Sequence, residues 1–266
     1  MLSEIVRTME EVKILPRLVV VSLHKSGTHL ILQLIEALGY QRRYFDDALI
    51  AKVRAEPPAV FLAGLEPNAA YFLHECPLDG FPRQFLEHWR ATNDPLFVYQ
   101  YRDPRAVLLS QVNYLRRSHR GREFSNTAYH LMFSDVLAAQ PTESDALSVA
   151  IDCMGDYLLK SFLGSVWMLH HPNVLSLNYE RLVGAEGGGS AIEQSEEVAR
   201  LLHHVGIDGN PQEIAAGLYD PSQRTFHRGN ANGWQQIYTR EQIERFESRY
   251  GHLLDIYGYP RVSASR

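Results

Sequence analysis

The sequence predicts a single-domain α/β fold, in which a doubly wound parallel sheet carries helices on both faces. Short apolar runs alternate along the chain with longer segments of helical periodicity, and this alternation is typical of such folds. The apolar runs are mostly continuous, as expected for parallel strands that are buried on both sides. A chain of 266 residues is long enough for one large domain, which we expect to span 1–266.

The predicted strands share a high content of leucine, valine, phenylalanine and tyrosine. They comprise residues 17–23, 70–74, 96–101 and 173–178. The predicted helices comprise residues 27–39, 82–90, 103–117, 124–170, 190–205 and 240–257. We also expect a short amphipathic helix within 1–11 and a flexible surface loop at 187–190, which is rich in glycine. Because ligands bind beyond the carboxyl ends of parallel strands, polar residues at those ends are candidates for a site.

The composition argues against several classes of protein. Hydrophobic residues make up 45% of the chain and charged residues 21%, which is ordinary for a globular protein. A net charge of −5 argues against a nucleic-acid partner, and no apolar stretch is long enough to span a membrane. Cys76 and Cys153 match neither a disulfide framework nor a zinc site. We therefore expect no metal, no membrane partner and a cytoplasmic location. The composition is compatible with either a monomer or a homodimer.

The segment Lys25-Ser26-Gly27-Thr28 is the most informative stretch of the chain. It follows a predicted strand and opens a predicted helix, whose first backbone N–H groups have no partners within the helix. Such a helix start binds anions, and Lys25 adds a full positive charge to it. The segment is not a complete Walker A motif, because His24 stands where that motif has a glycine. The sequence therefore predicts an anion-binding loop of a different kind.

A second candidate anion site lies at the end of the predicted strand 96–101. Arg102 follows this strand, Asp103 can cap the next helix, and Pro104 suits the first turn of that helix. Ser110 lies about two helical turns further on and can face the same side as Arg102. A guanidinium group with a hydroxyl suits a terminal phosphate. The alternative is a solvated arginine near a helix start.

A third candidate is the polar loop before the last predicted helix, residues 226–234. Arg228 adds positive charge there, and Gly229 permits close approach of the backbone to a ligand. Trp234 is expected to anchor this loop in the core. The alternative is a plain surface loop held by one tryptophan.

Together these segments resemble the sulfotransferases that use 3′-phosphoadenosine 5′-phosphosulfate (PAPS). Members carry a Pro-Lys-Ser-Gly-Thr-Thr-like loop after the first strand, a strand-end arginine followed by a serine, and a late Arg-Lys-Gly-x-x-Gly-x-Trp loop. The matching segments here are His24-Lys25-Ser26-Gly27-Thr28-His29, Arg102 with Ser110, His227-Arg228-Gly229 with Trp234, and Tyr179-Glu180 after a late strand. They occur in the order that is typical of the family.

The resemblance implies a P-loop-like phosphosulfate-binding loop, PAPS as the cofactor and PAP as the product. The cofactor-binding residues that it implies are Lys25, Ser26, Gly27, Thr28, His29, Arg102, Ser110, Tyr179, His227, Arg228 and Gly229. The first loop would hold the 5′-phosphosulfate, the arginines and Ser110 the 3′-phosphate, and Tyr179 would lie near the adenine. The chain departs from the family at His24, His29 and His227, and Leu30 stands where many members have a tryptophan that stacks on adenine.

The resemblance also implies catalytic roles for Lys25 and His74. Lys25 would stabilise the charge that grows on the leaving oxygen. His74 ends a predicted strand and would take the proton from the acceptor, a task that suits imidazole near neutral pH. Glu75 is the alternative base, since some members use a glutamate. Phe72 replaces a lysine that the family has two positions before the histidine.

The expected function is transfer of a sulfuryl group from PAPS to a hydroxyl or amine of a small-molecule acceptor. We expect the helical region of about 118–170 to form part of the acceptor site. Two other functions stay open. One is a non-catalytic protein that binds PAP or another nucleotide. The other is a P-loop kinase, which is disfavoured because the strand ends offer no obvious carboxylate to hold magnesium.

Overall fold

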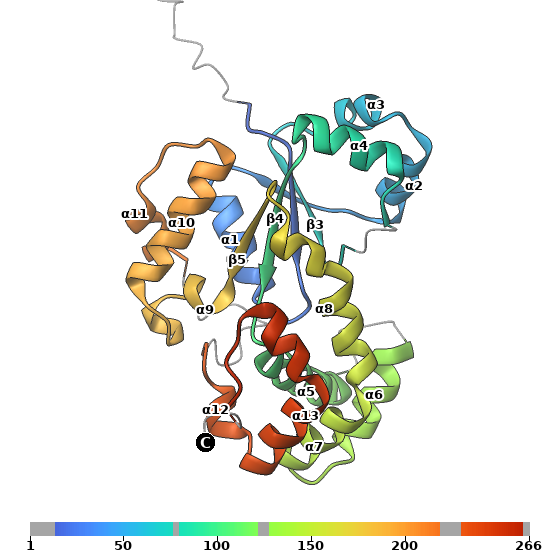
Figure 1. Ribbon diagram of the computed structural model, residues 1–266, viewed down its shortest axis with the longest axis vertical. Helices are drawn as coiled ribbons and strands as arrows, with labels where there is room; N and C mark the ends of the chain where they lie inside the picture. Colours follow the sequence, from blue (N-terminus) through green and yellow to red (C-terminus); the bar gives the residue numbers. More distant parts are fainter. Residues whose placement is uncertain (1–13, 77–79, 122–127, 219–229, 263–266) are drawn as a thin grey trace, which may run out of the picture.

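The computed structural model describes residues 14–76, 80–121, 128–218 and 230–262. Its centre is a sheet of five strands in the order β2-β3-β1-β4-β5 (Figure 1). The strands are β1 (Leu18–Ser22), β2 (Gln41–Tyr44), β3 (Ala69–Leu73), β4 (Leu96–Tyr101) and β5 (Val174–Asn178). Every neighbouring pair is parallel, so the predicted α/β fold class is confirmed.

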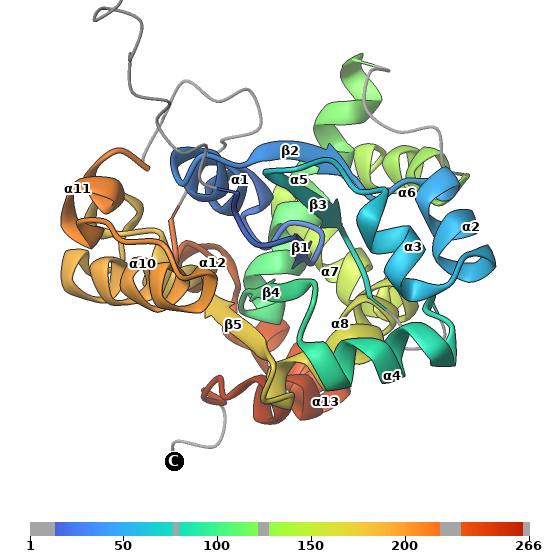
Figure 2. The same ribbon diagram turned by 90° about the horizontal axis from the view of Figure 1, so that it is seen from above.

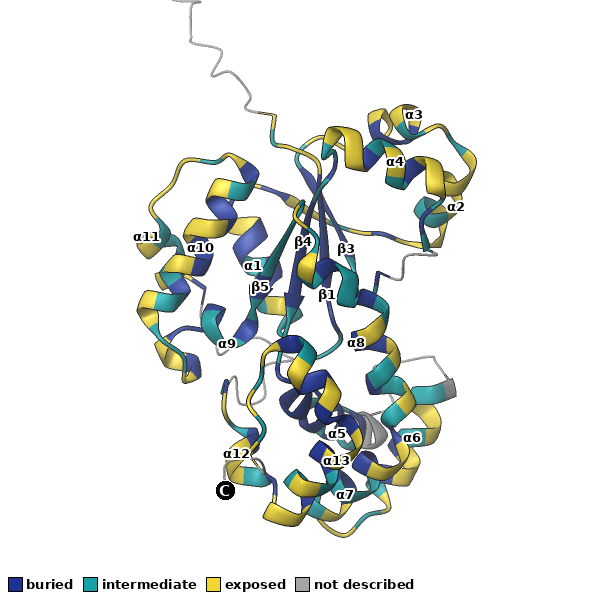
Figure 3. Cartoon of the chain, viewed as in Figure 1, coloured by how far each residue is buried: buried dark blue, intermediate teal, exposed yellow. Residues whose placement is uncertain are grey.

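The central strand β1 is buried along its whole length. Val20 pairs with Phe72 of β3 on one side and with Val98 of β4 on the other. Its neighbours Val19 and Val21 face one hydrophobic core, whereas Val20 faces a second core on the opposite side of the sheet. Figure 3 shows this strand as buried between its neighbours. Burial on both faces explains why the sequence of the strand is continuously apolar.

Helices cover both faces of the sheet, as Figure 2 shows. The core that contains Val20 is closed by apolar residues of α1 (Thr28–Ala37), α10 (Ala191–Val205) and α11 (Pro211–Ala216). The opposite core is closed by α4 (Arg83–Thr92) and α8 (Gly155–His170), which contribute Trp89 and Phe162. The sheet therefore forms the middle of a three-layer arrangement, which leaves the carboxyl ends of its strands as the place for a site.

A group of helices lies beyond the carboxyl ends of the strands (Figure 1). It comprises α5 (Pro104–Gly121), α6 (Ala128–Ala138), α7 (Glu143–Cys153), α12 (Trp234–Ile237) and α13 (Arg240–Tyr257). The long helical region predicted at 124–170 is thus divided into α6, α7 and α8. Thr142 and Asp145 form a capping box that starts α7, and Met154 separates α7 from α8.

Several elements were not predicted. They are the strand β2, the helices α2 (Asp47–Ala55), α3 (Pro58–Ala63), α9 (Tyr179–Leu182), α11 and α12, and the short 3₁₀-helix η2 (Ala185–Gly187). The strand β2 lies at the edge of the sheet, where Arg42 and Tyr44 are exposed, so its sequence carries no apolar run. The helix expected within 1–11 lies outside the described residues. No helix in the described ranges has the length and apolar character needed to cross a membrane.

The segment 187–190, predicted as a flexible surface loop, reaches the surface at Gly188 and contacts the late segment through Gly187. Gly187 is buried, and its carbonyl oxygen accepts a hydrogen bond from the Ala231 N–H at 2.8 Å. The Ser190 side chain accepts from the Glu193 N–H and caps α10. This turn packs against the segment that begins at Asn230, and it therefore helps to position the late loop near the strand ends.

Candidate functional site

The order of the strands brings the predicted polar residues to one edge of the sheet. His74 follows β3, Lys25 lies in the loop after β1, Arg102 follows β4, and Tyr179 follows β5. The strands β3, β1, β4 and β5 are consecutive neighbours. Lys25 therefore lies between the strand that delivers His74 and the strand that delivers Arg102.

The loop between β1 and α1 presents unbonded N–H groups at the start of a helix. Lys25 has a φ of 65° and Gly27 a φ of 93°, so the chain turns sharply through the left-handed region. The N–H groups of Gly27, Thr28 and His29 have no hydrogen-bond acceptor among the described residues. Unbonded N–H groups at a helix start are suited to hold an anion.

Buried hydroxyl groups hold the loop from beneath. Ser26 is fully buried, and its N–H and its Oγ both donate to the Leu23 carbonyl oxygen, at 3.0 Å and 2.6 Å. The Ser22 Oγ lies 3.0 Å from the Ser26 Oγ and 3.1 Å from the Thr28 Oγ1, and it donates to the Gln100 Oε1 at 3.2 Å. The Ser26 hydroxyl is thus engaged in supporting the turn in this structure.

The amino group of Lys25 lies against an aromatic ring. Its Nζ is 3.3 Å from the centroid of the Tyr114 ring, which α5 contributes. Burial, and to a smaller extent the positive charge of Arg117, lowers the pKa of Lys25 to about 7. In the described part of the chain, no carboxylate forms an ion pair with this amine. A partly buried cation that lacks a counter-ion favours the approach of an anion.

Tyr179 packs its ring against the turn of this loop. A β-carbon built on Gly27 would lie 2.2 Å from the Tyr179 Cδ2, so the ring fills the space beside that glycine. Tyr179 also forms a small apolar cluster with Val183 and Ala231, and Leu30 packs against this cluster. The leucine that replaces the family's tryptophan therefore lies with Tyr179.

Arg102 connects the first loop to the start of the late loop. Its Nη1 donates to the Lys25 carbonyl oxygen at 3.3 Å, and its Nη2 donates to the Asn230 carbonyl oxygen at 3.1 Å. The Cζ of the guanidinium lies 4.2 Å from the centroid of the Tyr179 ring. Its Nε is buried and has no hydrogen-bond partner among the described residues. Ser110 lies half-buried on α5, and no hydrogen bond joins it to Arg102 or to another described residue.

The predicted residues His227, Arg228 and Gly229 lie outside the described residues. The loop is described from Asn230 onwards. Trp234 is buried, and the Cζ of Arg105 lies 3.9 Å from the centroid of its ring. The expectation that Trp234 anchors this loop in the core is therefore confirmed.

A buried ionic network supports the backbone next to Arg102, and sequence analysis missed it. Arg105 is 1% exposed and forms ion pairs with Asp103 at 2.8 Å and with Glu247 at 3.3 Å. The Asp103 N–H donates to the Glu180 Oε1 at 3.0 Å. Asp103 also caps α5, because its Oδ1 accepts from the Arg105 N–H at 2.8 Å. An arginine two positions after a capping aspartate was the signal available in the sequence.

His74 is held at the end of β3 with one nitrogen engaged. Its Nδ1 lies 3.3 Å from the Ser22 carbonyl oxygen, which can only accept, so Nδ1 carries the proton and Nε2 is left as an acceptor. Burial lowers the pKa of His74, and the nearby Lys25 adds to this effect, whereas the bond to Ser22 opposes it. A neutral imidazole with a free Nε2 can accept a proton near neutral pH.

The carboxylate of Glu75 is bound to the helix behind it. The Ser161 Oγ of α8 donates to the Glu75 Oε1 at 2.8 Å. One residue further, the Cys76 N–H donates to the Ser165 Oγ at 3.1 Å, and the Trp167 Nε1 donates to the Cys76 carbonyl oxygen at 2.8 Å. These bonds tie the segment after His74 to α8.

Aromatic residues from α6 and α8 line the side of the site next to His74. The rings of Tyr129 and Tyr157 are stacked, with centroids 5.1 Å apart, and Tyr129 also contacts Phe133 at 4.5 Å. The ring of Tyr157 lies 6.3 Å from that of His24. This part of the chain falls within the helical region that was expected to contribute to the acceptor site.

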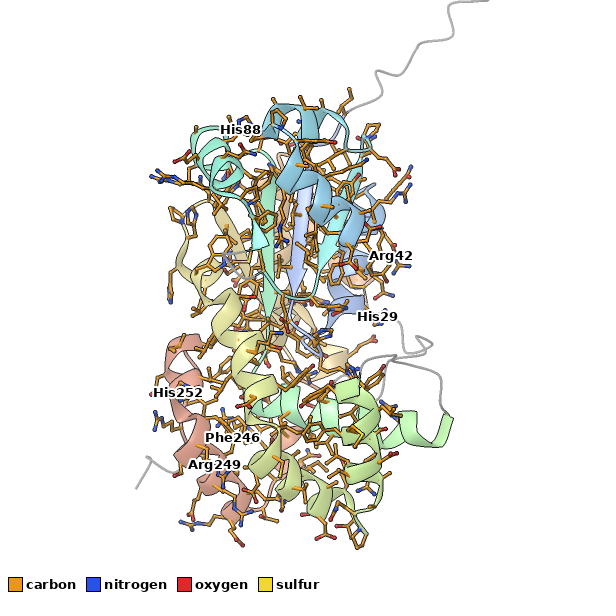
Figure 4. All side chains as sticks on the ribbon, turned by 90° about the vertical axis from the view of Figure 1, so that its right-hand side faces the viewer. His29, Arg42, His88, Phe246, Arg249 and His252 are labelled. Carbon is orange, nitrogen blue, oxygen red and sulfur yellow. The ribbon has the colours of Figure 1, made fainter. Side chains whose placement is uncertain are left out.

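His29 lies apart from this group. It is exposed at the start of α1, and Figure 4 shows it on the same side of the molecule as Arg42. Burial of part of the ring, together with the charges of Arg42 and Lys25, lowers its pKa. Its backbone N–H is one of the three unbonded N–H groups at the helix start.

Comparison with solved structures identifies this architecture. Mouse sulfotransferase SULT7A1 complexed with PAP has a TM-score of 0.60 and 18% sequence identity, over 90% of this chain and 84% of that one. The chain has the sulfotransferase fold. Retinol dehydratase in complex with androsterone and inactive cofactor PAP has a TM-score of 0.51 and 17% identity, over 90% of this chain and 80% of that one. No family model and no curated protein matches the sequence.

This sulfotransferase fold brings an anion-binding loop, an arginine and a histidine to one place. Among the residues that the structure describes, no group of three or more histidine, cysteine, aspartate or glutamate side chains could hold a metal ion. The polar groups that converge here are instead N–H donors, cations and the imidazoles of His24 and His74. Such a set can bind an anionic ligand and accept a proton beside it.

Proposed function

We propose that this chain is a PAPS-dependent sulfotransferase that transfers a sulfuryl group to a hydroxyl or amine of a small-molecule acceptor and releases PAP. The observation that carries the proposal is the position of Lys25. It lies in a helix-start loop with unbonded N–H groups, lacks a carboxylate partner in the described residues, and sits one strand away from His74. The shared fold with two structures that contain PAP supports it.

The residues present fit such a nucleotide. The N–H groups of Gly27, Thr28 and His29 would hold the 5′-phosphosulfate with the Lys25 ammonium. The buried Nε of Arg102 has no partner in the part of the chain that the structure describes, so this guanidinium retains a donor for the 3′-phosphate. We propose the same role for Ser110 and for the late-loop residues His227, Arg228 and Gly229. Tyr179 would flank the adenine.

The chain's own residues divide the chemistry between charge stabilisation and proton transfer. PAPS, when bound, supplies an activated sulfuryl group. Lys25 supplies positive charge where negative charge grows on the leaving phosphate, and the loop N–H groups fix the position of that phosphate. The Nε2 of His74 takes the proton from the acceptor hydroxyl or amine, since Nδ1 is engaged by Ser22. We propose no metal, because the transfer involves no polyphosphate.

The surroundings support a cytoplasmic enzyme with a small-molecule acceptor. Cys76 and Cys153 are both free thiols, which suits a reducing compartment. The aromatic rings of Tyr129, Phe133 and Tyr157 suit an acceptor with apolar surface. We propose no nucleic-acid or membrane partner. The proposal is compatible with a monomer or a homodimer.

Calorimetry with PAP, ADP and GDP tests the nucleotide assignment. We expect PAP to bind without magnesium, and we expect Lys25→Ala to weaken its binding. Binding of ADP or GDP with magnesium, but not of PAP, would favour a kinase and overturn the proposal. A screen of hydroxyl and amine acceptors with labelled PAPS then tests transfer. PAP binding without transfer to any acceptor would favour the non-catalytic alternative.

A further inference from the structure

His24 lies flat against His74. The two imidazole centroids are 4.0 Å apart, and the planes of the rings differ by 21°. His24 comes from the β1–α1 loop and His74 from the end of β3, so the contact joins two neighbouring strands. The resemblance described above offers no role for His24, because the family loop has a proline at this position.

The His74 ring is also held along its edge and from a second side. Its Nδ1–H donates to the Ser22 carbonyl oxygen at 3.3 Å. Phe72 meets the ring edge-on, with a centroid distance of 5.1 Å and an interplanar angle of 87°. The hydrogen bond to Ser22 fixes the position of Nδ1. Rotation of the His74 ring about this hydrogen bond is restricted by the groups that cover the two faces of the ring. His24 covers one of them.

The stacked geometry excludes direct proton transfer between the two imidazoles. Ring nitrogens donate and accept within the plane of the ring, whereas His24 and His74 face each other across their planes. Burial, and then the proximity of His74, lowers the pKa of His24 to about 3. His24 is therefore neutral at pH 7.

Other titratable and charged groups face the pair from the surrounding elements. Those that act on His74 are Lys25 of the β1–α1 loop, His29 of α1 and the adjacent Glu75. Lys25 also acts on His24, as does His130 of α6, and Tyr157 of α8 lies on the outer side of the His24 ring. Lys25 and His29 lower the pKa of His74, whereas Glu75 raises it. Because these charges oppose one another and burial is the largest cause, the charge state of His74 depends on how well water is excluded from its ring.

We propose that His24 is a positioning residue for His74: its neutral ring fixes the plane of the His74 imidazole and shields one face from water. This inference deepens the proposed function and rests on His74 acting as the base. When the plane of the ring is fixed, the lone pair of the His74 Nε2 is held in one orientation, in which it can take the proton from the acceptor. With the face shielded, His74 stays neutral near pH 7 and is able to accept a proton.

Histidine NMR of the ligand-free protein tests this role without the need for an acceptor. His24→Phe keeps a flat ring at the position, whereas His24→Ala removes it, and His24→Leu keeps the approximate volume without a flat face. We expect His24→Phe to preserve the Nδ1–H tautomer of His74 and its titration. In His24→Ala we expect the pKa of His74 to rise towards the ordinary histidine value and the Nδ1–H tautomer to lose population. His24→Leu should lose the tautomer with a smaller change in titration.

His252→Ala is the matched control. His252 is exposed on α13, and Figure 4 shows it well away from His29 and the β1–α1 loop. We expect this variant to leave the titration and the tautomer of His74 unchanged. If His74 titrates with the same pKa and the same tautomer in the three His24 variants as in the parent protein, the inference is overturned. His24→Leu keeps the test decisive if His24→Ala does not fold.

Kinetics separate the failure of this inference from the failure of the proposed function. With a competent acceptor, we expect His24→Ala to lower kcat on the order of tenfold to a hundredfold while KM for PAPS stays nearly constant. His24→Phe should restore most of that rate. If the His24 variants leave the titration and tautomer of His74 unchanged while the parent protein transfers the sulfuryl group, only the role of His24 is overturned. Transfer that persists in His74→Ala instead overturns the assignment of His74 as the base, and the NMR result then stands as a structural finding.

Discussion

The ring of Tyr179 occupies the space that any side chain at position 27 would need, since a β-carbon on Gly27 would lie 2.2 Å from the Tyr179 Cδ2. We therefore predict that Gly27→Ala displaces this ring and weakens binding of PAP at least tenfold, as measured by calorimetry. Gly27 also has a φ of 93°, which an alanine adopts only with strain. The expected loss of stability is about 2 kcal/mol or more, measured by urea denaturation.

Gly206→Ala separates backbone strain from the contact with Tyr179. Gly206 has a φ of 66°, and no atom lies within 4 Å of a β-carbon built there. We expect about 1 kcal/mol of destabilisation and unchanged binding of PAP. If the Gly27→Ala variant and the parent protein bind PAP equally well, the present position of the Tyr179 ring is not required for PAP binding.

Lys25 should make the stability of the protein depend on pH. Its pKa is about 7 in the folded chain and higher in the unfolded chain, so above pH 7 the unfolded chain binds the extra proton. The contribution of Lys25 to folding therefore becomes more favourable as pH rises. We predict that Lys25→Met is more stable than the parent protein at pH 7 and that this difference narrows by about 1 kcal/mol per pH unit up to pH 9.

Urea denaturation between pH 6 and pH 9 measures this effect. Lys52→Met serves as the control, because Lys52 is exposed on α2. The difference between that variant and the parent should stay constant with pH. A constant difference for Lys25→Met as well would contradict a lowered pKa for Lys25.

His74 and Glu75 should differ strongly as candidates for the base. The Nε2 of His74 is free, whereas one oxygen of Glu75 is bound by the Ser161 hydroxyl. We predict that His74→Ala lowers kcat by about 10²-fold or more and that Glu75→Gln lowers it less than about tenfold. Steady-state kinetics with a competent acceptor measures both. A larger loss in Glu75→Gln would transfer the base role to that carboxylate.

The buried pair of Arg105 and Glu247 should stabilise the fold far more than an exposed pair does. Removing one partner of a buried ion pair leaves the other charge uncompensated, at a cost of about 3–5 kcal/mol. We therefore predict this loss for Arg105→Leu, which leaves the buried carboxylates of Asp103 and Glu247 without this cation, as measured by urea denaturation. The exposed pair of Arg83 with Glu87 is the control, and Arg83→Leu should leave the urea midpoint unchanged.

The sequence predicts the buried part of the sheet better than its edge. The run 96–101 is a strand with the predicted bounds, and the predicted last helix is also observed from Arg240 to Tyr257. Both have strong local patterns, one continuously apolar and the other amphipathic. The strand β2 has no such pattern, because it forms at the edge by pairing with β3 while its side chains remain in solvent.

The candidate site was predictable where it depends on strand ends and helix starts. Lys25, His74 and Arg102 follow apolar runs, and parallel strands deliver such residues to one edge. The contact between His24 and His74 was not predictable. It depends on the left-handed backbone at Lys25 and on which strands are neighbours, neither of which local sequence patterns specify.

The ion pairs of Arg105 also determine when this site can exist during synthesis. Glu247 and Trp234, which hold Arg105 beside Arg102, lie in α13 and α12, after all five strands in chain order. The sheet and the β1–α1 loop are made long before them. The contacts that hold the backbone beside Arg102 are therefore complete only after α13 has been made and has docked against α5.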